Sequence, residues 1–435
     1  MGKLINIYRN PGAEECQALQ QRGVADLPSV RAVVADIISE VQHRGDGALF
    51  DYEKRFDGAD LTELRVSDAE IAEAELLVDD GFKKALQVAY ANIYRFHAAQ
   101  KMTPIEVETT PGVVCSQKAV PISKVGLYIP GGNAPLFSTV LMLAIPAKIA
   151  GCRDIVLCSP PNKEGKIHPA ILYAAKLSGV TEIYKIGGSQ AVAAMAFGTE
   201  SVPRVYKIFG PGNRFVMEAK LLVSEQGVAI DMPAGPAEVM IVADGSANPE
   251  FVAADFLSQA EHGPDSQSIL LTTDAGLAEK VEGEVVRLVD LLPSCAMIEK
   301  SLSHSRIIVF DKEEDMMAFA NEYAPEHLII NHSDAERLVE LVENAGSVFV
   351  GQYACESAGD YASGTNHTLP TSGYAHAYSG VNLDSFTKKI TVQTISADGI
   401  AALGPTIEVM AENEQLFAHK LAATVRLNYV NKMKQ

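Results

Sequence analysis

The chain has 435 residues, of which 47% are apolar and 21% charged, so its composition indicates a globular protein and its length predicts two or three domains. Acidic residues outnumber basic ones by 55 to 36, for a net charge of −19, which argues against a nucleic-acid partner because phosphate binding needs clustered Lys and Arg. We expect a cytoplasmic protein with reduced thiols, because no apolar run could span a membrane, no signal-peptide core opens the chain, and the six cysteines form no C-x-x-C pair.

The first part of the chain favours helices, at residues 28–56 and 68–100. In the first, LPSVRAVVADIISEVQ spaces its apolar positions three and four residues apart, as one face of an amphipathic helix requires. The RGDG that follows ends this pattern, so we expect the helix to break there.

From about residue 125, short β-branched runs alternate with helical segments. Continuous apolar strands that alternate with helices indicate parallel sheets covered on both faces. The alternation pauses before residue 237 and then resumes, which predicts two α/β units, each with its own open sheet. We find no sequence repeat between the two units, so only this shared pattern suggests a duplication. The expected strands are KVGLYIP, DIVLCSP, EIYKIGG, VYKIFG, EVMIVAD, SQSILLTTD, SRIIVF, HLIIN and SVFVG.

Residues 351–385 interrupt this alternation with a segment rich in Gly, Ser, Tyr and polar side chains. A loop of this length inside a compact chain is usually functional or disordered, and its Asp, His and aromatic content favours a function. The tail from residue 402 is typical of one or two helices that end the chain and could pack on a partner subunit.

Three junctions place glycines where a strand ends and a helix begins, and free backbone amides at such a junction face an anion. None of the three is a G-x-G-x-x-G motif. In the junction at residues 208–215, Phe215 stands where the third glycine would be. A tight turn from strand to helix also needs glycine for backbone reasons alone, so a dinucleotide or phosphate site and a structural role are equal alternatives. The junctions are GLYIPGGNAPLFST (126–139), IGGSQAVAAMAFGT (186–199) and IFGPGNRF (208–215).

Gln259 and His262 lie three residues apart just before a Gly-Pro break, so a helix there presents both on one face of its last turn. Asp360, His367 and His419 are further candidate metal ligands. Carboxylate and imidazole ligands suit Zn²⁺, with Mn²⁺ or Co²⁺ as alternatives. The zinc-protease signature H-E-x-x-H is absent. Spacing alone favours a polar helix end over a metal site.

Glu326 and His327 follow Pro325 at the start of the expected strand HLIIN. Neighbouring side chains point to opposite sides of a strand, but at its end both can reach one cleft and supply two separate proton-transfer groups. The alternative is a strand that starts with a solvated glutamate. Asp231 and Glu238 have a similar alternative, as polar residues that flank a Pro/Gly turn.

Taken together, eight segments resemble the histidinol dehydrogenase family from about residue 30 to the end of the chain. The resemblance implies that the chain converts L-histidinol to L-histidine by two successive NAD-dependent oxidations, the last steps of histidine biosynthesis. Short motifs recur by chance, but eight in the same order are specific. The segments are GLYIPGG, FGTESVP, KIFGPGN, IDMPAGPAE, LSQAEHGPDS, PEHLII, ESAGDYASGTNH and AHK.

The resemblance implies two open, mostly parallel Rossmann-like sheets flanked by helices, with an N-terminal helical segment and a C-terminal helical tail. Residues 1–127 would form helices that pack with residues 238–380 as the first α/β domain. Residues 128–237 would form the second, with the glycine junctions along the dinucleotide. Residues 381–435 would form the tail, which reaches the partner subunit of a homodimer with shared active sites.

The resemblance also implies a site with one zinc ion per subunit and NAD⁺ as the second cofactor. His327 would take the hydroxyl proton and Glu326 would activate water, while Glu414 and His419 would come from the partner subunit. The implied zinc ligands are Gln259, His262, Asp360 and His419; the substrate-binding residues are Ala237, Gln259, His262, His327, Asp360, His367, Glu414 and His419; and the NAD⁺-binding residues are Tyr128, Gln190 and Asn213.

Ala237 departs from the family pattern, which has Ser or Thr after PAGP. If that hydroxyl binds substrate, the affinity of this chain falls; if the backbone makes the contact, nothing changes. Two functions of other classes are alternatives to the dehydrogenase. One is a zinc hydrolase that uses the same ligands and Glu326 on water without a dinucleotide, and the other is a non-catalytic metal-binding α/β protein.

Overall fold

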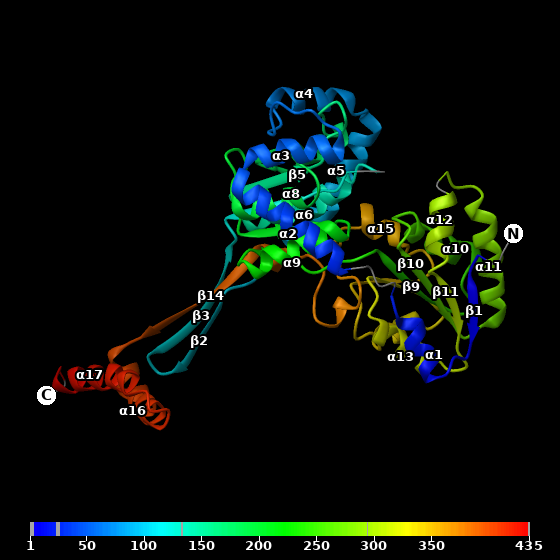
Figure 1. The fold of residues 1–435 in the computed structure, drawn as a ribbon. Coiled ribbons are helices and arrows are strands. Elements are labelled where there is room, and N and C mark those ends of the chain that lie inside the picture. Colours follow the sequence, from blue (N-terminus) through cyan, green and yellow to red (C-terminus); the bar gives the residue numbers. More distant parts are fainter. Residues whose placement is uncertain (1–3, 23–26, 132–133, 294, 434–435) are drawn as a thin grey trace. The chain divides into compact units, whose positions relative to one another are not determined.

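The computed structural model describes residues 4–22, 27–131, 134–293 and 295–433 (Figure 1). The chain divides into two compact units, one from residues 1–99 and 122–386 and the other from residues 100–121 and 387–435. Among the described residues, no helix combines the length and the apolar character that crossing a bilayer requires.

A five-stranded parallel sheet in the first unit has the strand order β6-β5-β4-β7-β8. Its strands and helices alternate along the chain as the sequence predicts. The strands are β4 (Lys124–Tyr128), β5 (Asp154–Ser159), β6 (Glu182–Lys185), β7 (Lys207–Phe209) and β8 (Ala229–Ile230), and the helices between them are α6 (Phe137–Ala150), α7 (Pro169–Ser178), α8 (Gly188–Phe197) and α9 (Arg214–Glu225).

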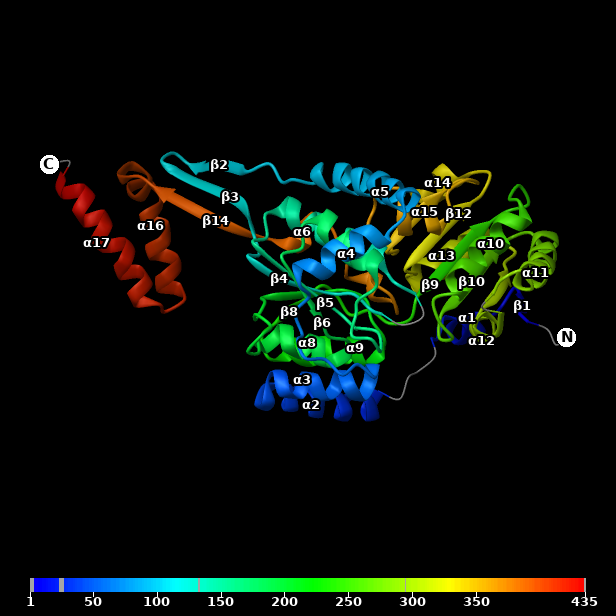
Figure 2. The same ribbon diagram turned by 90° about the horizontal axis from the view of Figure 1, so that it is seen from above.

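The helices between Leu27 and Ala98 cover this five-stranded sheet, which differs from the packing that we expected for residues 1–127. The strand Asn6–Arg9 and the helix Ala13–Gln20, by contrast, pack with the other sheet. Helices α2 and α3 lie on the side of α8 and α9, whereas α4 packs on α7 and α5 on α6 (Figure 2). The reason is apolar burial: Val34 and Ile38 of α2 share a core with Val192 of α8, and Ile93 of α5 shares one with Leu141 of α6. The helices are α2 (Leu27–Arg44), α3 (Asp46–Tyr52), α4 (Asp68–Leu77) and α5 (Asp80–Ala98), and a π-helical turn, η1 (Glu53–Asp57), follows α3.

A six-stranded parallel sheet, also in the first unit, has the order β1-β11-β10-β9-β12-β13. Apart from the edge strand β1, its strand order repeats that of the five-stranded sheet, which agrees with the suspected duplication. The strands are β1 (Asn6–Arg9), β9 (Glu238–Ala243), β10 (Gln267–Thr272), β11 (Arg306–Val309), β12 (His327–Asn331) and β13 (Ser347–Val350), and the helices are α1 (Ala13–Gln20), α10 (Pro249–Ala260), α11 (Ala275–Val289), α12 (Cys295–Leu302), α13 (Glu313–Tyr323) and α14 (Ala335–Val339).

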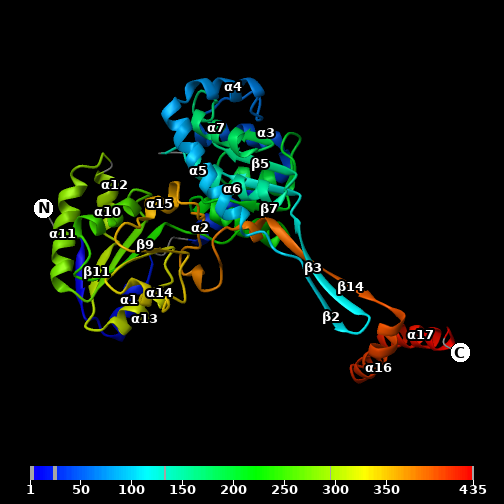
Figure 3. The same cartoon turned by 180° about the vertical axis from the view of Figure 1, so that it is seen from behind.

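Both faces of the six-stranded sheet are covered, so its central strands are buried along their whole length. Alternate residues of β9 enter two separate cores: Ile241 packs with Phe256 of α10, and Met240 packs with Phe319 of α13. Figure 3 shows α10, α11 and α12 on one face and α1, α13 and α14 on the other. Double burial explains why the sequence carries continuous apolar runs here and no polar alternation.

The second unit joins an antiparallel sheet of order β14-β3-β2 to two packed helices, α16 and α17. We expected residues 381–435 to be helical, and two helices are present. The strand β14 contradicts that expectation, since it pairs along its length with β3 from a distant part of the chain. The elements are β2 (Ile105–Thr110), β3 (Val113–Pro121), β14 (Thr387–Ile395), α16 (Ala397–Asn413) and α17 (Phe417–Met433).

Candidate active site

The first residues of two neighbouring strands mark the site. Glu238 begins β9 and His327 begins β12, and the two strands pair in register with His327 opposite Val239. Sites in open α/β sheets usually lie at the carboxyl ends of the strands, whereas this one lies at the amino ends. Helix α10 follows β9 and returns across the sheet, so its last turn reaches the same edge.

Helix α10 carries Gln259 and His262 to the site as the sequence predicts. Its first turn is capped by the Asn248 side chain, which accepts a hydrogen bond from the Glu250 N–H at 2.9 Å. Gln259 is fully buried in the last turn, and the N–H of His262 donates to the Gln259 carbonyl at 3.2 Å. The pair therefore lies on one continuous turn at the helix end.

A short helix, α15 (Glu356–Tyr361), supplies two carboxylates, in a segment that we expected to be a loop. Glu356 and Asp360 are four residues apart, so both project from one face of the helix. Gly359 between them permits a close approach to β13, because a methyl group at this position would lie 2.6 Å from the ring of Phe349. Two further short 3-10 turns, η2 (Tyr374–His376) and η3 (Leu383–Phe386), complete the segment.

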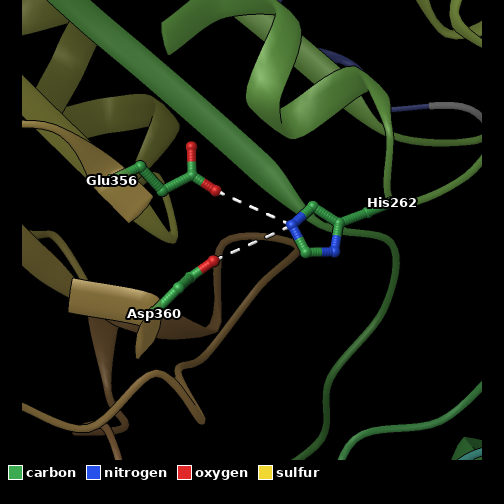
Figure 4. A group of neighbouring side chains, drawn as sticks. All are labelled: His262, Glu356 and Asp360. Atoms are coloured by element: carbon green, nitrogen blue, oxygen red, sulfur yellow. Dashed lines mark ion pairs between the residues drawn. The ribbon is translucent and has the colours of Figure 1, made fainter. Parts of the chain in front are cut away.

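The carboxylates of α15 converge on His262 (Figure 4). Its Nε2 atom lies 3.9 Å from Glu356 Oε1 and 3.9 Å from Asp360 Oδ2. One donor atom from each of the three side chains lies within 4.8 Å of the others. Imidazole and carboxylate are ligands that a divalent cation such as Zn²⁺ accepts, so the donors present fit the expected metal.

Gln259 lies beside this cluster. In the orientation that satisfies both ends of its amide, Nε2 donates to Glu356 Oε2 at 3.1 Å and Oε1 accepts from the Glu238 N–H at 2.5 Å. The reverse assignment would set oxygen against oxygen and N–H against N–H. A carbonyl oxygen has two lone pairs, so one is left to bind a cation.

His327 is a buried imidazole with one open nitrogen. Its Nδ1–H donates to the Glu238 carbonyl at 3.2 Å. Its Nε2 lies 3.6 Å from Asp360 Oδ1 and has no hydrogen-bond partner in the described part of the chain. Burial lowers the pKa of this imidazole, but the carboxylates of Glu326 and Glu356 outweigh burial and raise it to about 10.

Glu326 is the second proton-transfer candidate, and it lies against His327. Its Oε2 is 3.6 Å from His327 Nδ1 and accepts from the Glu238 N–H at 2.9 Å. Burial raises the pKa of the Glu326 carboxyl to about 8, and the same cause raises that of Glu356 to about 8. Perturbed groups of this kind cluster where proton transfer occurs.

Glu238 and Arg22 hold the start of β9 in place. The guanidinium of Arg22 donates to both carboxylate oxygens of Glu238, at 2.5 and 2.9 Å, and lies 3.8 Å above the ring of Tyr323. The Ser372 N–H donates to the same carboxylate at 3.0 Å. The Glu238 backbone binds Glu326, His327 and Gln259, and this ion pair anchors the side chain of the same residue.

His367 is close to the site but is not an open ligand. Its Nδ1–H donates to the Asp360 carbonyl at 2.9 Å, and its Nε2 lies 3.1 Å from the hydroxyl of Thr139, in the first turn of α6. Both ring nitrogens are therefore occupied. His367 links α15 to the helix that follows β4.

Ala237 directly precedes β9 and is partly exposed. Its carbonyl accepts a hydrogen bond from the Gln267 N–H at 3.1 Å. The backbone at this position is thus held by the sheet whatever side chain it carries.

The three residues expected to contact the dinucleotide lie together at the carboxyl edge of the five-stranded sheet. Tyr128 ends β4, and its hydroxyl accepts from the Gly188 N–H at 3.1 Å. Gln190 lies in the first turn of α8, and Asn213 caps α9 by accepting from the Phe215 N–H at 3.0 Å. Helix N-termini that follow β4, β6 and β7 therefore lie at one edge, where their free N–H groups favour an anion.

Glu414 and His419 belong to the second unit, with Glu414 in the turn after α16 and His419 in the first turn of α17. Both are exposed there, and the His419 N–H donates to the Leu416 carbonyl at 3.0 Å. Glu414 is the C-cap residue that follows α16.

Glu356 and Arg22 are the residues that sequence reasoning missed. The signal for Glu356 was its spacing of four from Asp360, which has meaning only if the segment is helical. Arg22 carried no local signal, because it meets Glu238 from 216 residues away.

The fold and the site define an α/β protein with a buried carboxylate–imidazole site that suits a divalent cation and proton transfer. A family model described as histidinol dehydrogenase matches residues 20–427. A histidinol dehydrogenase of Bacteroides fragilis is 56% identical over 98% of this chain and 100% of its own length, and one of Salmonella typhimurium is 53% identical over 95% and 96%. A crystal structure of histidinol dehydrogenase from Elizabethkingia anophelis is 52% identical, covers 99% of this chain and 100% of that chain, and superposes with a TM-score of 0.97. The chain therefore belongs to the histidinol dehydrogenase family, and it is an oxidoreductase.

Proposed function

We propose that the chain oxidises L-histidinol through L-histidinal to L-histidine, with two molecules of NAD⁺ and one zinc ion per subunit, as the last steps of histidine biosynthesis. One observation carries the proposal within this family. The buried imidazole of His327 has an open Nε2, with two carboxyls that can hold a proton beside its other nitrogen. Such a pair of acid and base groups fits two oxidations with different proton demands.

Gln259, His262 and Asp360 hold the zinc ion in this proposal, together with His419. A cation held there would orient the substrate, and its positive charge would oppose the effect of the nearby carboxylates and so lower the pKa of His327. The donor chemistry of the cluster supports this assignment, as does the exposure of His262, which leaves a path for the ion.

His327 takes the proton of the substrate hydroxyl at Nε2 while the carbon gives its hydride to NAD⁺, which leaves an aldehyde. Glu326 then accepts a proton from water as the water oxygen bonds to the aldehyde carbon. The resulting hydrate gives a second hydride to a second NAD⁺ and loses its remaining hydroxyl proton to solvent, and the carboxylate product forms. The tautomer supports the role of His327, because a Nδ1 that donates to the Glu238 carbonyl leaves Nε2 as the acceptor.

Tyr128, Gln190 and Asn213 bind NAD⁺ in this proposal, at the carboxyl edge of the five-stranded sheet. The helices that begin at this edge support the assignment, since their free N–H groups favour the pyrophosphate. His367 links this edge to Asp360, so a substrate held near α15 lies on the way to the dinucleotide.

We also propose that the active protein is a homodimer in which Glu414 and His419 serve the site of the partner subunit. The support is apolar surface on α16 and α17 of the second unit, which an isolated chain would leave in water. The exposed side chains are Val409 (60%), Met410 (61%), Phe417 (63%), Leu421 (59%) and Tyr429 (66%).

The test is absorbance at 340 nm with histidinol and NAD⁺. We expect NADH to form only when both are present, to stop forming after treatment with a chelator, and to form again when Zn²⁺ is added. A zinc hydrolase or a non-catalytic metal-binding protein produces no NADH. If the absorbance at 340 nm does not rise with the zinc-loaded protein, the proposal is contradicted.

A further inference from the structure

Two carboxylates that the mechanism does not use lie at the carboxyl edge of the five-stranded sheet. Glu53 and Asp57 are the first and last residues of the π-helical turn η1, and π-helical turns occur frequently at functional sites. Glu53 is fully buried, and Asp57 is half-buried. Among the described residues, neither carboxylate pairs with a Lys, Arg or His side chain, so neither takes part in a structural ion pair.

Glu53 is fixed against the start of α8. Its Oε1 accepts from the Gly187 N–H at 3.1 Å and from Gln190 Nε2 at 2.9 Å. Its Oε2 is buried without a hydrogen-bond donor. Burial raises the pKa of the Glu53 carboxyl to about 8, and burial also raises the pKa of Asp57, which is less buried than Glu53.

Asp57 lies where three strands end. A methyl group placed on Gly187, after β6, would lie 3.3 Å from Asp57 Oδ2 and 2.7 Å from Pro160, after β5. A methyl group on Gly131, after β4, would lie 2.5 Å from the same proline. The ring of Pro160 thus packs closely against both glycines at this edge, and the Asp57 carboxylate lies beside Gly187.

The order of the strands predicts which part of a bound dinucleotide lies near Asp57. In a sheet of order 3-2-1-4-5, the pyrophosphate binds after the first strand, and an acidic side chain at the end of the second strand binds the adenosine ribose. Here β4 is the first strand and β5 the second, and β5 ends in Ser159-Pro160-Pro161 without an acid. Asp57 supplies a carboxylate at the place where the second strand lacks one.

We propose that Asp57 accepts hydrogen bonds from the 2′- and 3′-hydroxyls of the adenosine ribose, and that it thereby selects NAD⁺ over its 2′-phosphorylated form. The inference rests on the proposed function, and it adds a residue that sets the choice of dinucleotide. A vicinal diol offers two donors to the two oxygens of one carboxylate, whereas a 2′-phosphate brings a second negative charge to the same place. Glu53 is a positioning residue that acts through Asp57 and Gln190.

Binding of NADH and NADPH, measured by calorimetry without substrate, tests the inference. Loss of charge-assisted hydrogen bonds in Asp57→Asn is expected to weaken NADH binding about 10- to 100-fold. In Asp57→Ser, which removes the charge and makes room, the preference for NADH over NADPH is expected to fall by at least about 10-fold. For both variants we expect kcat at saturating NAD⁺ and the KM for histidinol to stay as in the unmodified chain.

Asp60→Asn is the matched control. It removes the same charge three residues along the chain, where the side chain is exposed and pairs with Lys54. It is expected to leave both affinities unchanged. Glu53→Gln retains an acceptor for Gly187 and Gln190 and a donor for Asp57, so its NADH affinity is expected to stay within about 3-fold of the original.

Three outcomes are separable. If the unmodified chain binds NADH and Asp57→Asn binds it equally well, the inference is wrong and the proposed function stands. If Asp57→Asn lowers the melting temperature but leaves the ratio of NADH to NADPH affinity unchanged, Asp57 has only a structural role and the inference is again wrong. If the unmodified chain binds neither NADH nor NAD⁺, the proposed function and the inference fail together.

Discussion

Glu326 and His327 are adjacent in sequence, yet their surroundings give them different chemistry. The Glu238 backbone binds both, with its N–H on the Glu326 carboxylate and its carbonyl on Nδ1 of His327. The imidazole is therefore oriented with Nε2 open, and the carboxyl is buried strongly enough to hold a proton near neutral pH. One backbone unit thus orients two proton-transfer groups side by side, and the raised pKa of Glu326 makes its ionised carboxylate the stronger base toward water.

Glu326→Gln is predicted to separate the two oxidations. The amide cannot take a proton from water, so oxidation of the aldehyde should slow about 100- to 10,000-fold, while oxidation of the alcohol continues at His327. The measurement is the yield of NADH from a limiting amount of histidinol, with a hydrazine present to trap aldehyde. Equal rates of this variant with histidinol and with histidinal would show that Glu326 does not act on water.

Glu356→Gln is predicted to weaken metal binding, although Glu356 is not among the expected ligands. Its carboxylate holds the Gln259 amide and lies 3.9 Å from His262, so it orients one ligand and adds charge near another. Loss of such support typically costs 10- to 100-fold in metal affinity. Zinc content after dialysis against a graded series of chelator concentrations measures it. Glu250→Gln, on the exposed side of α10, is the control, and a zinc affinity that matches the control would remove Glu356 from this role.

Six of the residues named from sequence lie within one site. They could be predicted because each belongs to an element with a strong local signal or to a motif of the family. The site residues from sequence are Gln259, His262, Glu326, His327, Asp360 and His367. Glu356 was missed because its role depends on helix α15, which no local sequence pattern predicts. Arg22 was missed because an ion pair across 216 residues has no signature in sequence.

At the scale of elements, the parallel strands and the helices between them could be predicted from sequence, whereas the exposed strand β14 and the short helix α15 could not. Strands such as β9 and β10 are buried on both faces, so their apolar runs are continuous. Strand β14 is almost wholly exposed, and its partner β3 lies far away in the chain. Helix α15 has six residues, too few for a periodic pattern, and depends on close packing at Gly359.

His97 on α5 is predicted to make the stability of the fold depend on pH. Its Nδ1–H donates to the Ile93 carbonyl at 2.9 Å, and its Nε2 faces Asn366 Nδ2 at 3.3 Å, so the ring is neutral. Burial lowers its pKa below the ordinary 6.5. The contribution of His97 to the stability of the fold is therefore complete above pH 6.5, where neither the folded nor the unfolded state binds the proton. As the pH falls, the unfolded state gains the proton first, and stability falls by up to about 1.4 kcal/mol per pH unit.

Urea unfolding of the first unit at pH 7.5 and pH 5.5 measures this effect. His97→Gln is expected to lose less stability on acidification than the unmodified chain does, because it has no imidazole to protonate. If both proteins lose the same amount, the neutral, buried state of His97 does not contribute to the pH dependence.

At the scale of the whole molecule, the site and the dinucleotide edge belong to the first unit, and two expected site residues belong to the second. Thr139 and His367 connect the two edges within the first unit, since their hydrogen bond joins α6 to the segment that follows α15. Glu414 and His419 lie on a unit whose helices expose apolar side chains. In the homodimer proposed above, these two residues would serve the site of the partner subunit.

Mixing two inactive variants tests the shared site. His327→Ala and His419→Ala each abolish activity alone in this account, and when subunits are exchanged, the mixed dimer has one site with both changes and one site with neither. Random exchange should therefore restore about a quarter of the original activity. No recovery in a preparation whose mass by light scattering shows exchanged dimers would place His419 in the site of its own subunit.

The most direct test of the central claim is a count of reducing equivalents. A limiting, known amount of L-histidinol is oxidised to completion by the zinc-loaded protein with excess NAD⁺, and NADH is read at 340 nm while the product is identified by mass. The account predicts two NADH for each histidinol and L-histidine as the product. One NADH with histidinal as the end product, or no NADH at all, would contradict it.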